Sequence, residues 1–226
     1  MFGKISSWLG RLSVGRKLML IYLLDLSAVI YVSGILIHEK FQSIDFTRKE
    51  LVGTVYTRAV STQLMAPFLP PASRPSTEKA ALDETRALHD ELLHTESLSA
   101  AFAASLDAMP ARGADNPAAS NALLRAGREL LTAVGNQSNL ILDPDLDSYY
   151  VMSLAVLRFP ELLQVLHDTR ELLLRTPGRV SAQDLRAQRL TAAGRLDAVL
   201  QGMEADYNQA WLAGDNQLHT QLHASR

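Results

Sequence analysis

Three aspartates at alternate positions and two adjacent tyrosines stand together in the segment N-L-I-L-D-P-D-L-D-S-Y-Y-V-M. Asp143, Asp145 and Asp147 have the spacing of the first three ligands of an EF-hand calcium loop. Such a loop also needs a glycine at its sixth position and a bidentate glutamate at its twelfth, where this chain has Ser148 and Leu154. We therefore expect no calcium loop of this type.

A helix start explains the same aspartates. Asp143 is a good N-cap residue and Pro144 is favoured at the first helical position. Asp145 and Asp147 would then lie in the first turn, where negative charge interacts favourably with the helix dipole. The acids can therefore be purely structural.

Helix capping does not explain the residues on either side of the aspartates. Asn139 precedes them, and Tyr149 and Tyr150 follow. Tyrosine rings are amphipathic, so they either line a pocket or pack in a core with the hydroxyl satisfied. With Asp143 and Asp147, these three residues are candidates for ligand binding.

A second polar cluster lies in K-E-L-V-G-T-V-Y-T-R-A. Glu50, Gly53 and Thr57 share one helix face, and Gly53 would allow a neighbouring helix or a ligand to approach closely. Arg58 could clamp a carboxylate, although an arginine on a helix surface is often simply solvated. Glu50, Tyr56 and Arg58 are the candidate ligand-binding residues of this segment.

No residue set indicates catalysis or metal binding. His219 and His223 are four residues apart, but the intervening T-Q-L lacks the glutamate of H-E-x-x-H and no third ligand is evident. The chain has no G-x-S-x-G motif and no glycine-rich phosphate loop. We expect a protein that is not an enzyme and that uses no metal or cofactor.

Composition narrows the class of protein further. The chain has 226 residues, of which 47% are hydrophobic, and a formal net charge of -2. This length allows one domain with a real core, and the near-neutral charge argues against nucleic acid as a partner. The chain has no cysteine, so disulfides and thiolate chemistry are excluded.

A stretch of apolar residues near the N-terminus, 18–37, is long enough to cross a bilayer and carries one charge, Asp25. Arg11, Arg16 and Lys17 precede it, so the positive-inside rule places the N-terminus in the cytoplasm. A cleaved signal peptide is the alternative, but the stretch is long and no clean A-x-A site follows. Asp25 either has a function in the membrane or pairs with a polar group across a helix dimer.

These observations divide the chain into three parts. Phe2, Ile5 and Trp8 recur at helical spacing among basic residues, which indicates an amphipathic helix on the cytoplasmic leaflet. The predicted parts are a cytoplasmic amphipathic N-terminus at 1–17, a transmembrane helix at 18–37 and an extracytoplasmic helical region at 38–226.

The extracytoplasmic region reads as all-α, since no run of alternating β-branched residues occurs. The first helix should continue through Leu64 to a proline-rich segment, and the second should run from Ser76 or Thr77 to about Ala108. The remaining helices are expected from Asn116–Pro117 to the aspartate motif, from that motif to Arg175, and from a capping box at Ser181 and Asp184 onward.

Apolar stripes of such helices must be buried against one another. We therefore predict an elongated antiparallel four-helix-bundle-like fold with one N-terminal transmembrane helix. The last helix carries a coiled-coil-like line of residues that suits a core or a dimer contact. Its members are Leu196, Leu200, Met203, Tyr207, Trp211, Leu218 and Leu222.

The arrangement resembles the N-terminal sensory region of bacterial methyl-accepting chemotaxis proteins and hybrid sensor histidine kinases. The resemblance covers most of residues 10–205 and rests on E-L-V-G-T-V-Y and on S-N-L-I-L-D-P-D-L-D-S-Y-Y-V-M followed by R-F-P-E-L-L. It departs from the pattern at Ala59, where proline is expected, and at Ser153, where an acid is expected. In such receptors a second span, a HAMP linker and a signalling module follow.

The resemblance implies a sensor input region in the bacterial inner membrane, with the bulk of the chain in the periplasm. Its expected partners are the membrane, a second copy in a homodimer, and an unknown small-molecule ligand or periplasmic protein. The sequence shows one span and no signalling module, so the chain is either a fragment or a stand-alone bundle. The alternative function is a membrane-anchored helical scaffold that binds other proteins.

Overall fold

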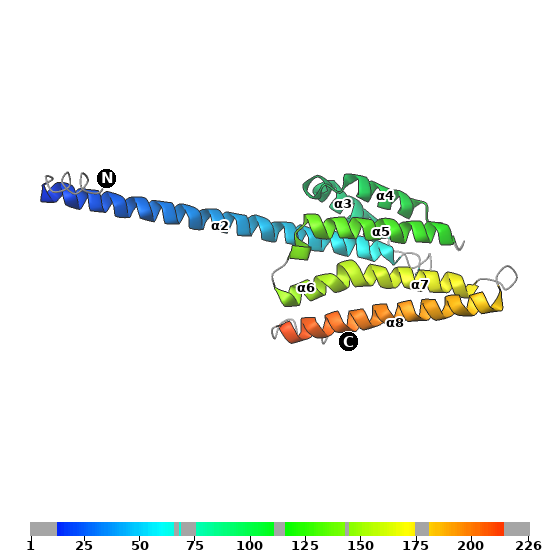
Figure 1. The fold of residues 1–226 in the computed structure, drawn as a ribbon. Coiled ribbons are helices and arrows are strands. Elements are labelled where there is room, and N and C mark those ends of the chain that lie inside the picture. The colour runs from blue at the N-terminus through cyan, green and yellow to red at the C-terminus, as the bar shows by residue number, and fades with distance from the viewer. Residues whose placement is uncertain are drawn as a thin grey trace. The chain divides into compact units, whose positions relative to one another are not determined.

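The computed structural model describes residues 13–65, 68, 76–110, 116–142, 145–174 and 181–214. This part of the chain is helical and contains no strand, so the all-α prediction is confirmed (Figure 1). The elements in chain order are α2 (Val14–Leu64), α3 (Ser76–Leu93), α4 (Glu96–Asp107), α5 (Pro117–Gln137), the 3-10 helix η3 (Leu140–Leu142), α6 (Leu146–Met152), the π-helix η4 (Ser153–Arg158), α7 (Phe159–Leu174) and α8 (Ala182–Ala213).

Some predictions concern residues outside this description. They are most of the amphipathic N-terminus, the Asp143 cap with Pro144, the pair His219 and His223, and the last two members of the apolar line on the final helix.

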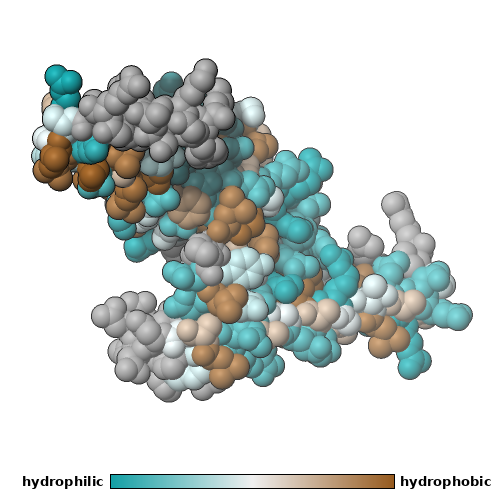
Figure 2. Space-filling view, turned by 60° about the vertical axis from the view of Figure 1, so that its left-hand side comes forward, coloured by the Kyte–Doolittle hydropathy of each residue, from teal (hydrophilic) through white to brown (hydrophobic). Residues whose placement is uncertain are grey.

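Helix α2 is one continuous helix through Leu64, as the sequence predicts. Its first part belongs to a structural unit that ends at Thr47, and a second unit begins at Arg48. The apolar side chains of 18–37 are exposed, and Figure 2 shows uncovered hydrophobic side chains on the molecular surface. Helix α2 is therefore long and apolar enough to cross a membrane.

A second stretch, Leu146–Leu174, meets the same length and composition criteria, and a third of its most apolar window, 33%, is buried. This stretch comprises α6, η4 and α7, which contribute Met152, Val156 and Leu163 to the core. Length and apolar composition are also properties of a core helix, and these three buried side chains have that role here.

The expected single helix over 76–108 was wrong, because the structure divides it into α3 and α4. His94 has a left-handed backbone with φ 51°, and the Thr95 amide donates to the Asp90 carbonyl at 3.1 Å. The segment contains no proline or glycine that could signal this turn. The turn depends instead on side-chain hydrogen bonds to Asp90, which hydrophobic periodicity does not encode.

Two predicted helix starts are confirmed. The Asn116 side-chain oxygen accepts from the Ala119 amide at 3.1 Å, and Pro117 is the first residue of α5. The Ser181 hydroxyl oxygen accepts from the Asp184 amide at 3.1 Å at the start of α8. Both caps satisfy backbone donors that have no partner within the helix.

The buried positions of α8 differ from the predicted apolar line. Val199, Asp206 and Ala210 are buried, whereas Leu200 is 48% exposed and Tyr207 is half-buried. The predicted apolar line of α8 therefore lies next to the helix face that is buried against the other helices of this chain. An acidic residue occupies the centre of the buried face.

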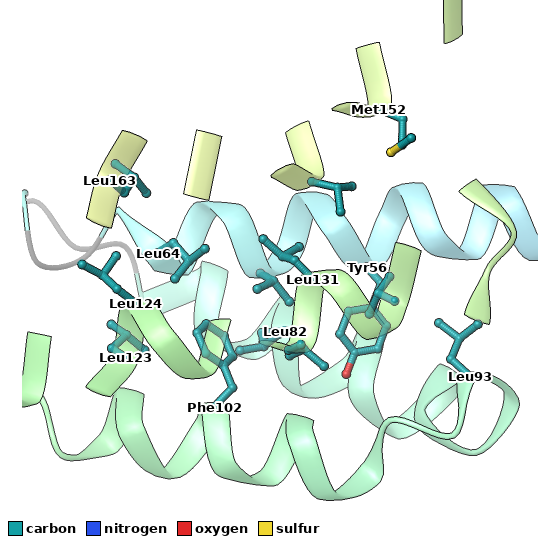
Figure 3. Packing of buried hydrophobic residues seen from close by; sticks show 14 residues of the cluster. Tyr56, Leu64, Leu82, Leu93, Phe102, Leu123, Leu124, Leu131, Met152 and Leu163 are labelled. Atoms are coloured by element: carbon teal, nitrogen blue, oxygen red, sulfur yellow. The ribbon is translucent and has the colours of Figure 1, made fainter. Parts of the chain in front are cut away.

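The core joins the C-terminal part of α2 to helices from the rest of the second unit. Tyr56 and Leu64 from α2 lie in one apolar cluster with Phe102, Leu124 and Leu131 (Figure 3). Helix α5 contacts α4 and α7, and α8 contacts α6 and α7. Burial of these large side chains is the main source of stability for the unit.

A buried hydrogen-bond network around the Asp90 carboxylate connects α2, α3 and α4. Its Oδ1 atom accepts from the Tyr56 hydroxyl at 2.5 Å and from Thr95 Oγ1 at 2.9 Å, and its Oδ2 atom accepts from Ser99 Oγ. Tyr56, Thr95 and Ser99 have no exposed surface. Because a buried carboxylate is costly without donors, these contacts fix the turn between α3 and α4 against α2.

Burial raises the pKa of the Tyr56 phenol above its ordinary value of 10.0, and the adjacent Asp90 carboxylate raises it further. In the unfolded chain the phenol loses its proton near pH 10, while the folded protein retains it. The free energy of unfolding therefore decreases as the pH rises above 10, because the unfolded chain then gives up a proton that the folded protein keeps.

We predict that Tyr56→Phe lowers the free energy of unfolding by about 1–2 kcal/mol at neutral pH, because Asp90 loses a donor. Above pH 10 the free energy of unfolding of the wild-type protein should fall by about 1.4 kcal/mol per pH unit relative to that of this variant. Thermal and urea unfolding of the full chain in detergent between pH 8 and about 11 measures both effects. Tyr31→Phe removes the hydroxyl of an exposed ring and is the control. A stability difference between wild type and Tyr56→Phe that does not change with pH would contradict a raised pKa of the Tyr56 phenol.

Candidate functional site

The residues of the E-L-V-G-T-V-Y-T-R segment do not form a common site in the structure. Tyr56 lies in the core with its hydroxyl on Asp90, whereas Arg58 is exposed and Glu50 is half-buried. Gly53 is buried against the residues that follow α5, namely Ser138 and Leu140. The segment therefore serves mainly to pack the C-terminal part of α2 within the second unit.

Gly53 is required for this close approach. A Cβ atom there would lie 2.1 Å from Ser138 Oγ and 2.4 Å from Ser138 Cβ. Real Cβ atoms do not approach other atoms so closely, so a side chain would push α2 away from the end of α5.

The aspartate motif begins α6, but the helix starts later than the sequence predicts. Asp145 occupies the N-cap position, so the prediction that it lies in the first turn was wrong. Asp147 does lie in the first turn, and its Oδ1 atom accepts from the Ser148 amide at 2.8 Å. Asn139 has a left-handed backbone with φ 65° before η3, a conformation that asparagine tolerates better than most residues.

Tyr149 and Tyr150 lie at a polar pocket of about 500 Å³, which we call the α5–η4 pocket. Their rings meet edge to face, with centroids 5.4 Å apart. Pockets of this volume are typical of small-molecule sites. The polar residues that line it are Arg128, Thr132, Tyr149, Tyr150, Ser153, Arg158, Glu161 and Asp206.

The wall of this pocket is formed partly by the π-helix η4. Asp206 Oδ2, from α8, accepts from Ser153 Oγ at 2.8 Å and from Arg158 Nε at 2.9 Å. Residues five positions apart lie about 140° apart around an α-helix, whereas the wider π turn brings them toward the same side. The Asp206 carboxylate therefore holds both ends of η4 in the π geometry.

Two arginines line the pocket, and their environments differ. Arg158 is 35% exposed and already paired with Asp206, with Glu161 Oε2 at 3.9 Å from its Nη1 atom. Arg128 is exposed, and its guanidinium makes no ion pair with the residues that the structure describes. Arg128 is therefore available to an anionic ligand.

The sequence reasoning missed Arg128, Arg158 and Asp206. Asp206 had a detectable signal, since it lies seven residues after Val199 and four before Ala210, at a position where an apolar residue is expected. An acid at such a position needs a buried partner. The partner itself, Arg158, is 48 residues away in the sequence and cannot be identified from spacing.

Metal binding finds no support in the described ranges. No group of three or more histidine, cysteine, aspartate or glutamate side chains there could hold a metal ion. Asp147 lies at the start of α6, and the pocket acids Glu161 and Asp206 interact with Arg158.

A second, apolar pocket of about 600 Å³ lies between α2, η4 and α8. Val151, Leu154 and Phe159 form one wall, and Met203 and Tyr207 form the other. It offers few polar groups that could orient a small molecule.

Comparison with known proteins does not assign the chain to a family. No family model, characterised protein or solved structure shows a significant match to the chain. Inferences about function therefore rest on the pocket, on α2 and on the motifs in the sequence.

We predict that Gly53→Ala lowers the free energy of unfolding by about 2 kcal/mol through overpacking. Adding Ser138→Gly should restore part of this loss, because it removes the two nearest atoms. Gly194→Ala, at an open position of α8, should instead stabilise the helix by up to about 1 kcal/mol. Thermal unfolding of the full chain measures all three. A neutral Gly53→Ala would contradict the close packing of α2.

We predict that Asp206→Ala lowers the free energy of unfolding by about 2 kcal/mol, because it leaves Arg158 and Ser153 without their common acceptor. Amides of η4 should also exchange hydrogen faster. Asp197→Ala, which removes an exposed carboxylate from the same helix, is the control. Equal effects of the two substitutions on stability and exchange would show that Asp206 does not hold η4.

Proposed function

We propose that this chain is the membrane-anchored, extracytoplasmic input region of a bacterial signal-transduction receptor of the chemotaxis or two-component type. In this proposal the C-terminal part of α2, α5, the α6–η4–α7 segment and α8 form an antiparallel four-helix bundle that works as a homodimer in the periplasm. The α5–η4 pocket would bind a small molecule or part of a periplasmic protein.

The observation that carries the proposal is a polar pocket built around a π-helix. Such segments are rare and frequently occur at functional sites. Here the π segment is held by an ion pair between two elements, Arg158 in η4 and Asp206 in α8. A ligand that changes this pair would change the free-energy difference between two helix geometries.

Continuous packing gives a route from the pocket to α2. Val156 of η4 packs on α5 at Gly135, where a Cβ atom would lie 3.2 Å from Val156 Cγ1. Ser138, which follows α5, packs on Gly53 of α2. Helix α2 also contains the apolar residues 18–37, so a displacement of its core residues would be transmitted along the same helix.

The alternative function is a membrane-anchored helical scaffold. The apolar pocket beside Phe159 and Met203 favours it, because an uncovered apolar surface often marks a protein contact. A scaffold would not need the π-helix or the arginines of the α5–η4 pocket. Small-molecule binding at that pocket therefore separates the two functions.

The experiment is a thermal-shift screen of the full chain in nanodiscs against organic acids, amino acids and purines. A true ligand at about 100 times its Kd should raise the Tm by about 5 °C or more. Tyr149→Ala should abolish the shift, and Leu146→Ala, an exposed residue of the same helix, should retain it. Absence of any stabilising compound, or a shift unaffected by Tyr149→Ala, would favour the scaffold.

A further inference from the structure

We propose that the α5–η4 pocket recognises small organic carboxylates, which Arg128 and Arg158 hold in place of the Asp206 carboxylate. This inference rests on the proposed sensory function and specifies its ligand class and its trigger.

The donors for a carboxylate are already present. Arg128 is exposed at the pocket and pairs with no acid among the residues described. Arg158 donates to Asp206 through Nε, while its Nη1 atom lies 3.9 Å from Glu161, beyond hydrogen-bond distance. Two guanidinium groups with free N–H donors match the geometry of a carboxylate.

The charge balance of the pocket favours a ligand with few negative charges. Arg128 and Arg158 are opposed by Glu161 and Asp206, so the four formal charges cancel. A highly charged phosphate ester would meet two carboxylates, whereas one carboxylate group needs only the cation that Arg128 supplies. Val156 and the tyrosine rings provide apolar walls for the body of the ligand.

Asp206 is the internal competitor of such a ligand. Its carboxylate occupies Arg158 in this structure, just as a ligand carboxylate would. A bound carboxylate that takes over Arg158 weakens the hold of Asp206 on η4, and Ser153 alone cannot keep both ends of the π segment together. Ligand binding would therefore favour rearrangement of η4, which packs on α5 at Gly135.

The test measures binding to the full chain in nanodiscs by calorimetry. Benzoate and butyrate are the probes, and benzamide and butyramide are their neutral counterparts of similar shape. We expect the carboxylates to bind and the amides not to bind. Arg128→Gln should weaken carboxylate binding about tenfold, because one charge-assisted hydrogen bond contributes on that order, and Arg125→Gln on the same helix should not.

The competition is tested at Asp206. Asp206→Asn should tighten carboxylate binding about tenfold by releasing Arg158, and Asp197→Asn should leave it unchanged. If Asp206→Asn does not fold, the comparison of Arg128→Gln with Arg125→Gln decides, since both side chains are exposed.

The outcomes separate this inference from the sensory proposal. Amides that bind as tightly as carboxylates, or carboxylate binding unaffected by Arg128→Gln, would overturn the carboxylate class. If a neutral compound then bound in a manner that Tyr149→Ala abolishes, the pocket would still be a sensor site. If neither these probes nor the wider screen gave a ligand, both proposals would fail.

Discussion

The site depends on the contacts that the Asp206 carboxylate makes with η4. This carboxylate is buried in α8 and accepts hydrogen bonds from both ends of η4, through Ser153 and Arg158. A buried acid without such donors would be strongly destabilising, so helix geometry and side-chain chemistry are coupled at this point. The pocket, with its tyrosines and its second arginine, is organised around this coupling.

A second carboxylate, that of the partly buried Asp90, has a different role. It joins α3 and α4 to α2 through three hydroxyl donors, while Arg86 Nε lies 4.0 Å from its Oδ2 atom, beyond hydrogen-bond distance. This network stabilises one arrangement of the turn and of Tyr56. The two acids therefore differ in kind: Asp90 fixes a contact, whereas Asp206 holds a pair of groups for which a ligand can compete.

Local rules predicted much of the fold. The caps at Asn116 and Ser181 and the continuity of α2 follow from residue types within one helical turn. The break at His94 and the π-helix were not predictable in this way. Each depends on an acid that receives hydrogen bonds from other elements, and Asp206 is 53 residues from Ser153.

The candidate site could be predicted only in part from the sequence, because its residues come from helices that are far apart along the chain. Tyr149 and Tyr150 were singled out by their position after the aspartates, and the structure places both at the α5–η4 pocket. Tyr56 came from an equally suggestive segment but lies in the core. Side-chain chemistry alone does not distinguish a phenol that faces a pocket from one that satisfies a buried acid.

Occupation of the α5–η4 pocket should alter the packing of α2. Hydrogen-exchange mass spectrometry of the full chain in nanodiscs, with and without a stabilising ligand, tests it most directly. We expect altered protection in 149–162, which covers η4, and also in 48–64, the part of α2 that belongs to the second unit. A change confined to 149–162, with α2 unaffected, would contradict it.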